Sequence, residues 1–210
     1  MATQPPKTDG REARAIDSAM ELRFASDERT GPGTATGYAA RFNVWADIGG
    51  AWRERFVPGA FTRTLAHDDI LAVHSHDKGR VVGRTGAGTL TLRQDDSGLA
   101  FENPLPDTTD GRDLSVSIGR GDIPGMSFAF IARRQEWNEM VEPPERTIFE
   151  ADLIEITYSA KPAYSDTSVG LRSLDEARKE RRSQNFDAAA RRVARKMTVD
   201  LRSRGVTSKA

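Results

Sequence analysis

Short runs of alternating polar and apolar residues, broken by Gly, Pro, Asp and Asn, recur between residues 22 and 159. A period of two is typical of half-buried β-strands. Residues 89–93 alternate in this way, and the Asp95-Asp96-Ser97-Gly98 turn that follows predicts a hairpin into residues 99–101. Residues 126–132 and 153–159 are two further candidate strands. The pattern therefore predicts a mainly β fold of the α+β class.

Helical signals in this part of the chain are few and short. Thr62 is a predicted N-cap for a helix that runs through residue 65. A second helix is predicted over residues 111–119, with Asp110 or Asp113 near its start and Gly119 near its end. Helices of this length are expected to flank a sheet rather than to form a bundle of their own.

The length of 210 residues is enough for one domain with a hydrophobic core. Residues 1–20 have little apolar periodicity and are predicted to form a flexible leader. Residues 21–171 contain the predicted strands and helices and are expected to form the folded domain. Residues 172–210 show no core face and are predicted to be a basic tail, partly helical or disordered.

The tail differs in charge from the rest of the chain. The net charge of the whole sequence is zero, but residues 171–210 contain twelve Lys and Arg against five Asp and Glu, a net charge of +7. Such asymmetry predicts an acidic partner, which is nucleic acid, an acidic protein surface or the body of the same chain. A solvated helix face explains the same charges equally well.

Composition excludes several classes of function. The sequence has no Cys, which rules out disulfides and a thiol nucleophile and is typical of a reducing compartment. It has no long apolar run and no secretory signal pattern, so we expect a soluble, cytoplasmic protein with no membrane partner. No cofactor-binding motif is present, and we expect no cofactor.

Ser127 is the first candidate for chemistry. In Gly125-Met126-Ser127-Phe128-Ala129-Phe130, the two-residue period places the large apolar side chains on one face and Ser127 with Ala129 on the other. Most strand serines in such a position simply face solvent. Gly125, however, permits the close approach of another backbone or of a substrate.

Glu155 has the same kind of position on the other candidate strand. In residues 153–158, Ile154, Ile156 and Tyr158 are predicted to face inward, and Glu155 with Thr157 outward. Neighbouring strands would then present Ser127 and Glu155 on one outer surface.

The sequence has three histidines, His67, His74 and His76. On an extended strand, His74 and His76 would point to the same side, an arrangement that can bind a metal with Asp77 as a third ligand. Alternatively, one of them serves as a base. A serine hydroxyl needs an adjacent base to take its proton, and a carboxylate beyond the imidazole fixes the tautomer of the base. The chain contains all three parts of such a triad.

Six motifs occur in an order and spacing that resemble the prohead (procapsid maturation) serine protease family of tailed bacteriophages. They span residues 21–171 and are Gly37-Tyr38-Ala39 with Phe42-Asn43, the run of residues 54–61, His76-Asp77 with Gly83-Arg84, residues 98–101, residues 125–130, and residues 153–156 leading into residues 161–164. In fold, that family is related to the herpesvirus protease assemblin.

The resemblance implies roles for individual residues. The serine of Gly-Met-Ser-Phe implies Ser127 as nucleophile, the histidine before Asp implies His76 as general base, and the glutamate before the Pro-Ala segment implies Glu155 as the orienting acid. His74 stays the alternative base, because the family pattern often has Asn-His where this chain has His74-Ser75-His76. A herpesvirus-protease-like β-barrel with its site on the outer surface is the implied fold.

The implied activity is cleavage of scaffold segments and major capsid protein extensions inside the assembling prohead, in the cytoplasm of a bacterial host, with self-cleavage and a homodimer also expected. An oxyanion hole is required, and Arg133-Arg134 are candidates to supply it through a backbone N–H or a guanidinium, although an Arg pair at a strand end is more often simply solvated. Two alternatives remain: a non-enzymatic capsid-assembly module that binds through the basic tail, and a metal hydrolase built on His74, His76 and Asp77.

Overall fold

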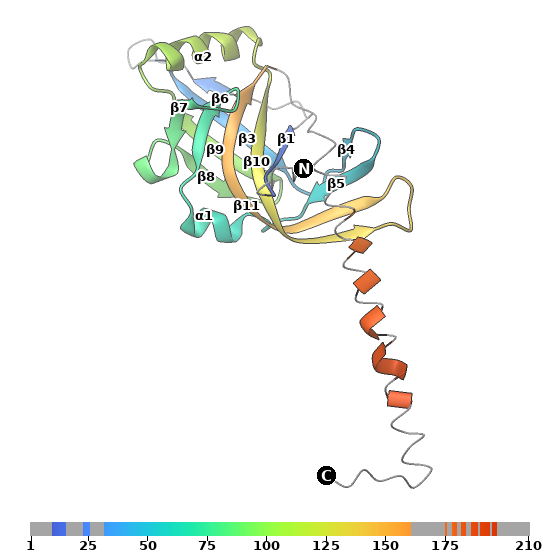
Figure 1. Cartoon of the computed structure of the whole chain (residues 1–210). Helices are drawn as coiled ribbons and strands as arrows, with labels where there is room; N and C mark the ends of the chain where they lie inside the picture. Colours follow the sequence, from blue (N-terminus) through green and yellow to red (C-terminus); the bar gives the residue numbers. More distant parts are fainter. Residues whose placement is uncertain are drawn as a thin grey trace, which may run out of the picture. The chain divides into compact units, whose positions relative to one another are not determined.

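The computed structural model describes residues 10–15, 23–25 and 32–160, together with positions 175, 178–179, 182–183, 186–188, 190–193 and 195–196 (Figure 1). The chain divides into two compact units, Met1–Val169 and Gly170–Ala210. The described positions of the second unit are all helical. None of the helices in the described part of the chain has the length and apolar character of a membrane-spanning segment.

The larger sheet of the first unit has seven strands and is built around one long central strand. Its strands are β1 (Glu12–Ala15), β4 (Ala46–Ile48), β5 (Trp52–Phe56), β6 (Leu71–His74), β7 (Asp77–Arg84), β10 (Gly125–Asn138) and β11 (Glu145–Ser159). The order is β1-β10-β11-β5-β4, and β6 pairs with the other end of β11 and with β7. β10 and β11 run together as a long antiparallel hairpin (Figure 1), and the far part of β11, Glu145–Ile148, pairs with β5.

The smaller sheet has four strands in the order β2-β3-β9-β8. Its strands are β2 (Arg23–Ala25), β3 (Thr34–Arg41), β8 (Thr91–Gln94) and β9 (Gly98–Pro104). The Asp95 carboxylate accepts hydrogen bonds from the amides of Ser97 (2.8 Å) and Gly98 (3.0 Å), which closes the turn between β8 and β9. The hairpin predicted at this point is therefore confirmed.

The described residues of the first unit also contain three helical segments. They are α1 (Thr62–His67), the 3₁₀ turn η1 (Thr85–Ala87) and α2 (Thr109–Arg120). Thr62 is the first helical residue of α1 and not its N-cap, which is Phe61. α2 is two residues longer at its start than predicted, because Thr108 is its N-cap and accepts from the amide of Gly111 (3.3 Å). Gly121 ends α2 in the left-handed conformation.

One hydrophobic core draws on both sheets. Four phenylalanines form its centre, with the ring centroids of contacting pairs 5.0–6.0 Å apart, and they are Phe56, Phe61, Phe128 and Phe130. A polar contact also joins the sheets, since the buried hydroxyl of Tyr158 donates to the side-chain oxygen of Asn103 (3.0 Å). A Cβ at Gly83 would overlap with the Asn103 amide, which explains a glycine inside β7.

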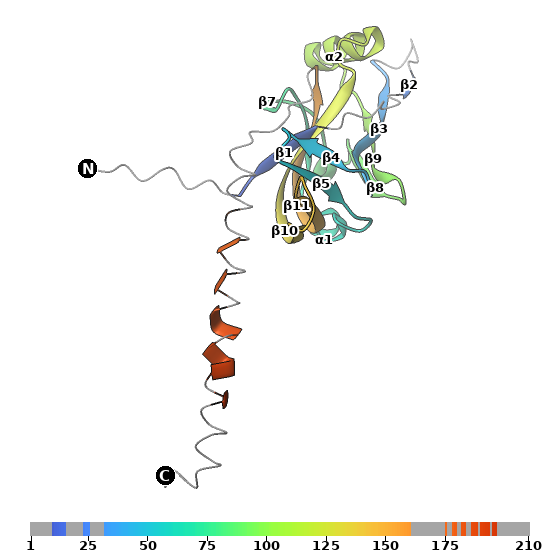
Figure 2. The same ribbon diagram turned by 90° about the vertical axis from the view of Figure 1, so that its right-hand side faces the viewer.

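The prediction of a mainly β protein with short helices is confirmed. The expected closed barrel is not: the described strands form two open sheets. The leader expected over residues 1–20 also differs, because Glu12–Ala15 form β1, which pairs antiparallel with β10. Both views of the molecule show β1 against β10 (Figures 1 and 2).

Candidate active site

Ser127 lies near the start of β10, where the predicted alternation holds. Met126 and Phe128, on either side of it, face the hydrophobic core. Ser127 faces the opposite side, as predicted, but it is 0% exposed, because the expected outer surface is covered at this point, where Ala15 of β1 pairs with Ser127. Its Oγ lies 3.1 Å from Nε2 of His76 and also donates to the main-chain carbonyl of Arg14 in β1 (2.8 Å).

His76 lies in a two-residue turn and not on a strand. His74 ends β6 and pairs with Asp77, which begins β7, so Ser75 and His76 form the turn between them. Both have positive φ, 55° and 58°, as both central residues of a type I′ hairpin turn require. The prediction that His74 and His76 share one side of an extended strand is therefore wrong, because the chain reverses between them.

Thr157 anchors this turn from β11. Its Oγ1 accepts a hydrogen bond from the backbone amide of His76 (2.9 Å) and donates to the carbonyl of Val73 (3.1 Å). The carbonyl of Tyr158 accepts from the amide of Ser75 (3.0 Å). Three hydrogen bonds thus hold the turn against the strand that also contains Glu155.

Glu155 completes the chain of contacts that begins at Ser127. It faces the same side of β11 as Thr157 and is fully buried, with Oε1 2.9 Å from Nδ1 of His76 and Oε2 2.7 Å from a guanidinium nitrogen of Arg11. Burial opposes its ionisation, but the hydrogen bond to His76 and the charge of Arg11 outweigh burial and hold the pKa of Glu155 below its usual value. The carboxylate is therefore ionised at neutral pH.

The fold thus brings together Ser127, His76 and Glu155 from three elements. In the pairing of β10 with β11, Ser127 lies opposite Thr157 and Ala129 lies opposite Glu155, so Ser127 and Glu155 share one face. With Glu155 ionised, the imidazole donates through Nδ1 and leaves Nε2 free to accept a proton from the Ser127 hydroxyl. This arrangement can activate a serine for attack on a carbonyl carbon.

The other two histidines have different surroundings. His67 is exposed at the end of α1. Burial, followed by the charge of Arg80, lowers the pKa of His74. Within the described part of the chain, Nδ1 of His74 is buried without a hydrogen-bond partner. His76 is the histidine that lies within hydrogen-bond distance of Ser127. His74 is the last residue before the turn that contains His76.

A metal site would need three or more ligating side chains close together. Among the described residues, no group of three His, Cys, Asp or Glu side chains is placed to hold a metal ion. The predicted metal site required His74 and His76 to point to the same side of one extended strand. The chain reverses at Ser75 instead, between the two histidines.

Arg133 and Arg134 do not lie beside Ser127. They follow Ser127 by six and seven residues on the same strand, which places them roughly 20 Å further along it at about 3.3 Å per residue. Arg133 pairs with Asp152 (2.6 Å), and the guanidinium of Arg134 lies over the ring of Phe149 (4.9 Å). Neither is placed to stabilise an oxyanion at Ser127.

A buried ion network lies on the other face of β1. Arg14 donates to both carboxylate oxygens of Glu54 (2.7 and 3.0 Å), and Arg146 donates to both oxygens of Glu12 (2.7 and 2.8 Å). All four side chains are nearly inaccessible to solvent. Burial opposes the ionisation of Glu54, but Arg14 and Arg146 hold its pKa below the usual value.

Arg11 and Arg14 were not predicted as residues of this region, and the contact of Thr157 with His76 was not predicted either. Arg11 and Arg14 lie in the segment predicted to be a leader, although Glu12-Ala13-Arg14-Ala15 alternates charged and small residues, which is a strand signal. Thr157 was expected to lie beside Glu155 on the same face, but a hydrogen bond to the histidine turn cannot be read from periodicity.

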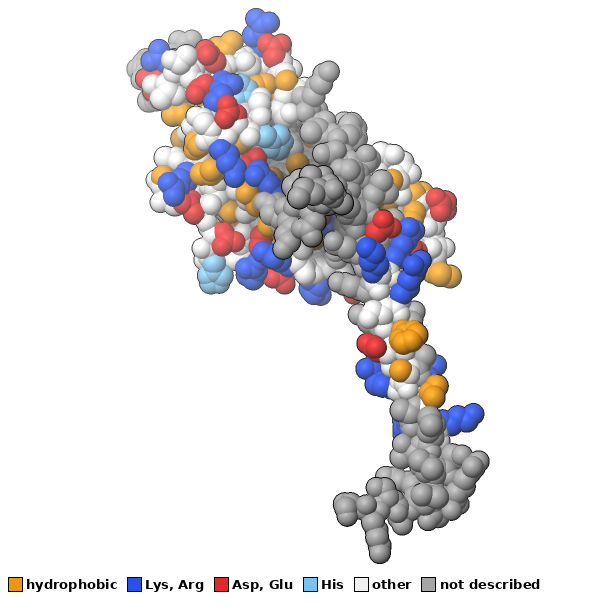
Figure 3. Space-filling view, in the orientation of Figure 1, with side chains coloured by type: hydrophobic (Ala, Val, Ile, Leu, Met, Phe, Trp, Pro, Cys, Tyr) orange, Lys and Arg blue, Asp and Glu red, His pale blue; other side chains and the backbone are white. Residues whose placement is uncertain are grey.

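The surface offers few further pointers. Exposed ion pairs, such as Arg112 with Asp107 (2.6 Å), belong to a surface on which both signs of charge are interspersed (Figure 3). Charge alone therefore does not single out a site on the face shown.

Comparison with known proteins gives one match. A family model described as "Caudovirus prohead serine protease" matches residues 20–180. No curated protein and no solved structure matches the chain.

Proposed function

Because the chain belongs to the caudovirus prohead serine protease family, we propose that Ser127, His76 and Glu155 are its catalytic triad. The family is one of serine proteases that act in phage capsid maturation. The observation that supports the assignment is the continuous series of contacts, 3.1 Å from Ser127 Oγ to His76 Nε2 and 2.9 Å from His76 Nδ1 to Glu155 Oε1.

Each member has a distinct part in peptide hydrolysis. Ser127 Oγ attacks the carbonyl carbon of the scissile bond while His76 Nε2 takes its proton. His76 then gives that proton to the leaving amine, and a water molecule hydrolyses the resulting acyl-enzyme by the reverse proton path. Glu155 stays ionised, holds the imidazole by Nδ1 and stabilises the imidazolium that forms.

The substrates in this proposal are scaffold segments and the extensions of the major capsid protein inside the assembling prohead of a bacterial host. Self-cleavage, a homodimer and a fold relation to herpesvirus assemblin remain predictions. The protease domain is assigned to residues 21–171. The basic tail, residues 172–210, is assigned to targeting within the assembly, through an acidic protein surface or nucleic acid.

Co-expression with the capsid and scaffold proteins of the same phage tests the triad. Wild-type protein is expected to give shortened products, and Ser127→Ala, His76→Ala and Glu155→Ala to lower the rate by about 10⁴-fold or more, as for other triads. His67→Ala and His74→Ala are matched histidine controls that should keep activity. Loss of cleavage in His74→Ala with retention in His76→Ala would reassign the base.

A second experiment addresses the tail. If it contacts phosphates, binding of the full chain to DNA is expected to weaken steeply as salt increases. Tail-dependent binding to the capsid or scaffold protein, with no binding to DNA at the same salt concentration, would favour an acidic protein surface instead.

A further inference from the structure

We propose that β1 occupies the substrate position of the enzyme, and that it presents the Arg14–Ala15 peptide bond to Ser127. On this proposal, substrates are extended peptides that pair antiparallel with β10, with a basic residue before the cut bond and an acidic residue two positions earlier. The inference rests on the proposed function and identifies the substrate class of the same site.

The first observation is the register of the strand pair. β1 pairs with β10 from Glu12 opposite Phe130 to Ala15 opposite Ser127, and within the described residues β10 is the strand it pairs with. Addition of a strand to a sheet edge is a common way to bind extended peptides, in which main-chain hydrogen bonds give affinity. The edge of β10 that leads to the nucleophile is thus filled by a segment of the enzyme itself.

The second observation is the contact at the nucleophile. Ser127 Oγ donates to the Arg14 carbonyl oxygen at 2.8 Å, and with a C=O bond of about 1.23 Å the carbonyl carbon lies at most about 4 Å from Oγ. Reacting atoms in productive complexes are about 3–3.5 Å apart. A small shift of β1 therefore brings this carbonyl into range of attack.

The same contact explains how β1 restrains the enzyme. A serine hydroxyl has one proton, and here two acceptors share it, the Arg14 carbonyl and His76 Nε2. While the proton points to the carbonyl, the base cannot take it. Arg11, from the same segment, also pairs with Glu155 (2.7 Å), so the leader contacts both ends of the triad.

The third observation is that alternate side chains of β1 fill charged sites. Arg14 is held by both oxygens of Glu54, and its guanidinium lies 5.3 Å from the ring centre of Phe130. Both oxygens of Glu12 accept hydrogen bonds from the two terminal guanidinium nitrogens of Arg146. Alternate pockets of this kind give specificity in strand addition, and a buried ion network is otherwise weak evidence for stability. Glu54 and Arg146 therefore form the sites for a basic and an acidic substrate side chain.

The step is an ordinary peptide hydrolysis within the chain. Ser127 Oγ bonds to the Arg14 carbonyl carbon, its proton passes to His76 Nε2, and the bond from that carbon to the Ala15 nitrogen breaks as the nitrogen takes the proton. Water then hydrolyses the ester and restores Ser127. The products are residues 1–14 and a chain that begins at Ala15.

Intact mass measurement and N-terminal sequencing of the purified full chain test this inference over time. Wild-type protein is expected to accumulate a chain that begins at Ala15, and Ser127→Ala to keep residues 1–14. If wild-type protein cleaves the co-expressed capsid or scaffold protein but gives no Ala15 terminus, the inference is overturned and the proposed function stands. If neither cleavage occurs, both are overturned.

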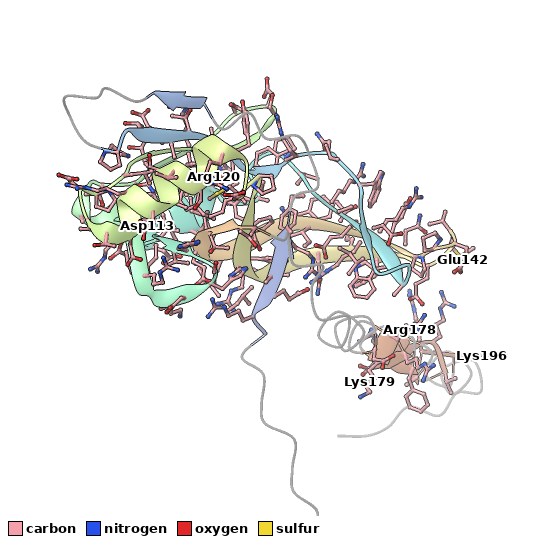
Figure 4. All side chains as sticks on the ribbon, turned by 90° about the horizontal axis from the view of Figure 1, so that it is seen from above. Asp113, Arg120, Glu142, Arg178, Lys179 and Lys196 are labelled. Carbon is pink, nitrogen blue, oxygen red and sulfur yellow. The ribbon has the colours of Figure 1, made fainter. Side chains whose placement is uncertain are left out.

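Variants of Arg14 test the recognition site. Arg14→Gln is expected to slow formation of the Ala15 terminus at least about tenfold, since a charge-assisted contact is lost, and Arg14→Lys to slow it less. Arg120→Gln is the matched control: Arg120 lies at the end of α2, where its exposed side chain pairs with Asp122 (2.7 Å) (Figure 4). Equal rates for Arg14→Gln and the control would overturn the assignment of Glu54.

Cleavage sites in the prohead proteins give a test that does not depend on the folding of any Arg14 variant. Products of the wild-type reaction are sequenced from their N-termini. The cuts are expected to follow Arg or Lys, with Asp or Glu two residues earlier. Cuts after apolar residues that lack this acidic residue would overturn the inference and leave the enzyme a prohead protease.

Discussion

Thr157 is the residue that connects the candidate base to the strand of its carboxylate. Its hydroxyl has one proton to give, which goes to the Val73 carbonyl, and it accepts the amide of His76 with a lone pair. The side chain is fully buried, so water cannot replace either bond. Thr157 is therefore a positioning residue, which acts on the chemistry through the place of His76.

Replacement of Thr157 by Val is expected to leave the amide of His76 without its partner. The free energy of unfolding should fall by about 1–3 kcal/mol, and kcat/KM on a prohead substrate by about tenfold or more. Thr157→Ser keeps the hydroxyl and should restore both, together with the pH profile of kcat/KM. Thr147→Val, on the same strand, is the control. A loss of stability with an unchanged kcat/KM would reduce Thr157 to a structural role.

The ionisation of Glu155 predicts how stability depends on pH. Folding lowers its pKa, so the carboxylate stabilises the native state above the unfolded value of about 4.3 and loses this contribution as pH falls through the lower folded pKa. The difference in unfolding free energy between wild type and Glu155→Gln should therefore be full above about pH 4.3 and shrink below it.

Denaturant titrations at a series of pH values measure this difference. Glu142→Gln provides the control, because Glu142 is exposed at the far end of the β10–β11 hairpin (Figure 4). The control difference should stay flat over the same range. A Glu155 difference that is equally flat would contradict the ion-paired state of this carboxylate.

Periodicity was enough to predict the faces of Ser127 and Glu155, but not their burial. Both were expected on an outer surface, and both are covered in the structure. The place of His76 could not be derived from periodicity, because it depends on a two-residue turn. Both residues of that turn are left-handed, and the sequence Ser75-His76 is not a recognised signal for this conformation. Asn-Gly or Asp-Gly would have been the recognisable signal.

The turn between β6 and β7 stores strain next to the proposed triad. Ser75 is exposed and has φ of 55°, a region that costs an ordinary L-residue about 1–2 kcal/mol and a β-branched one more. We expect Ser75→Asn to be more stable than Ser75→Val by at least about 1 kcal/mol in urea denaturation. The same pair at Ser117 in α2 should differ little, because Asn and Val have similar helix propensities. Equal stabilities at Ser75 would contradict the left-handed turn.

Among the elements, those with one apolar and one polar face were the ones predicted from sequence. The β8–β9 hairpin and the first half of β10 are examples. The second half of β10, up to Asn138, lies beyond the strand predicted over residues 126–132, because several of its positions are exposed or half-buried and it lacks a continuous apolar stripe. β1 was not predicted because its buried side chains, Glu12 and Arg14, are charged rather than apolar. Burial by ion pairing leaves no hydrophobic signal.

At the scale of the whole first unit, the ion network joins three segments distant in sequence. β1 contributes Glu12 and Arg14, β5 contributes Glu54, and the β10–β11 hairpin contributes Arg146. Taking charges out of water is costly, and each depends on its partners to offset that cost. The position of β1 therefore depends on the pairing of Arg14 with Glu54 and of Glu12 with Arg146.

Arg146→Met is expected to leave the carboxylates of Glu12 and Glu54 short of a partner and to lower the free energy of unfolding by about 3–5 kcal/mol. Arg133→Met is the control on the same hairpin, where the exposed Arg133 pairs with Asp152, and should cost no more than about 1 kcal/mol. Urea denaturation measures both. Equal losses of unfolding free energy in the two variants would show that burial of the ion network adds nothing to the stability of the protein.

The strand at the edge of β10 and the nucleophile belong to one polypeptide, and this decides the kinetic order of the proposed self-cleavage. A tethered segment has an effective concentration in the millimolar range that dilution does not change. Release of β1 would then be first order, with a half-life independent of how many copies are packed together. A peptide from another chain competes with β1 at that fixed local concentration until self-cleavage releases β1. The rate of self-cleavage therefore sets the time at which other chains become substrates.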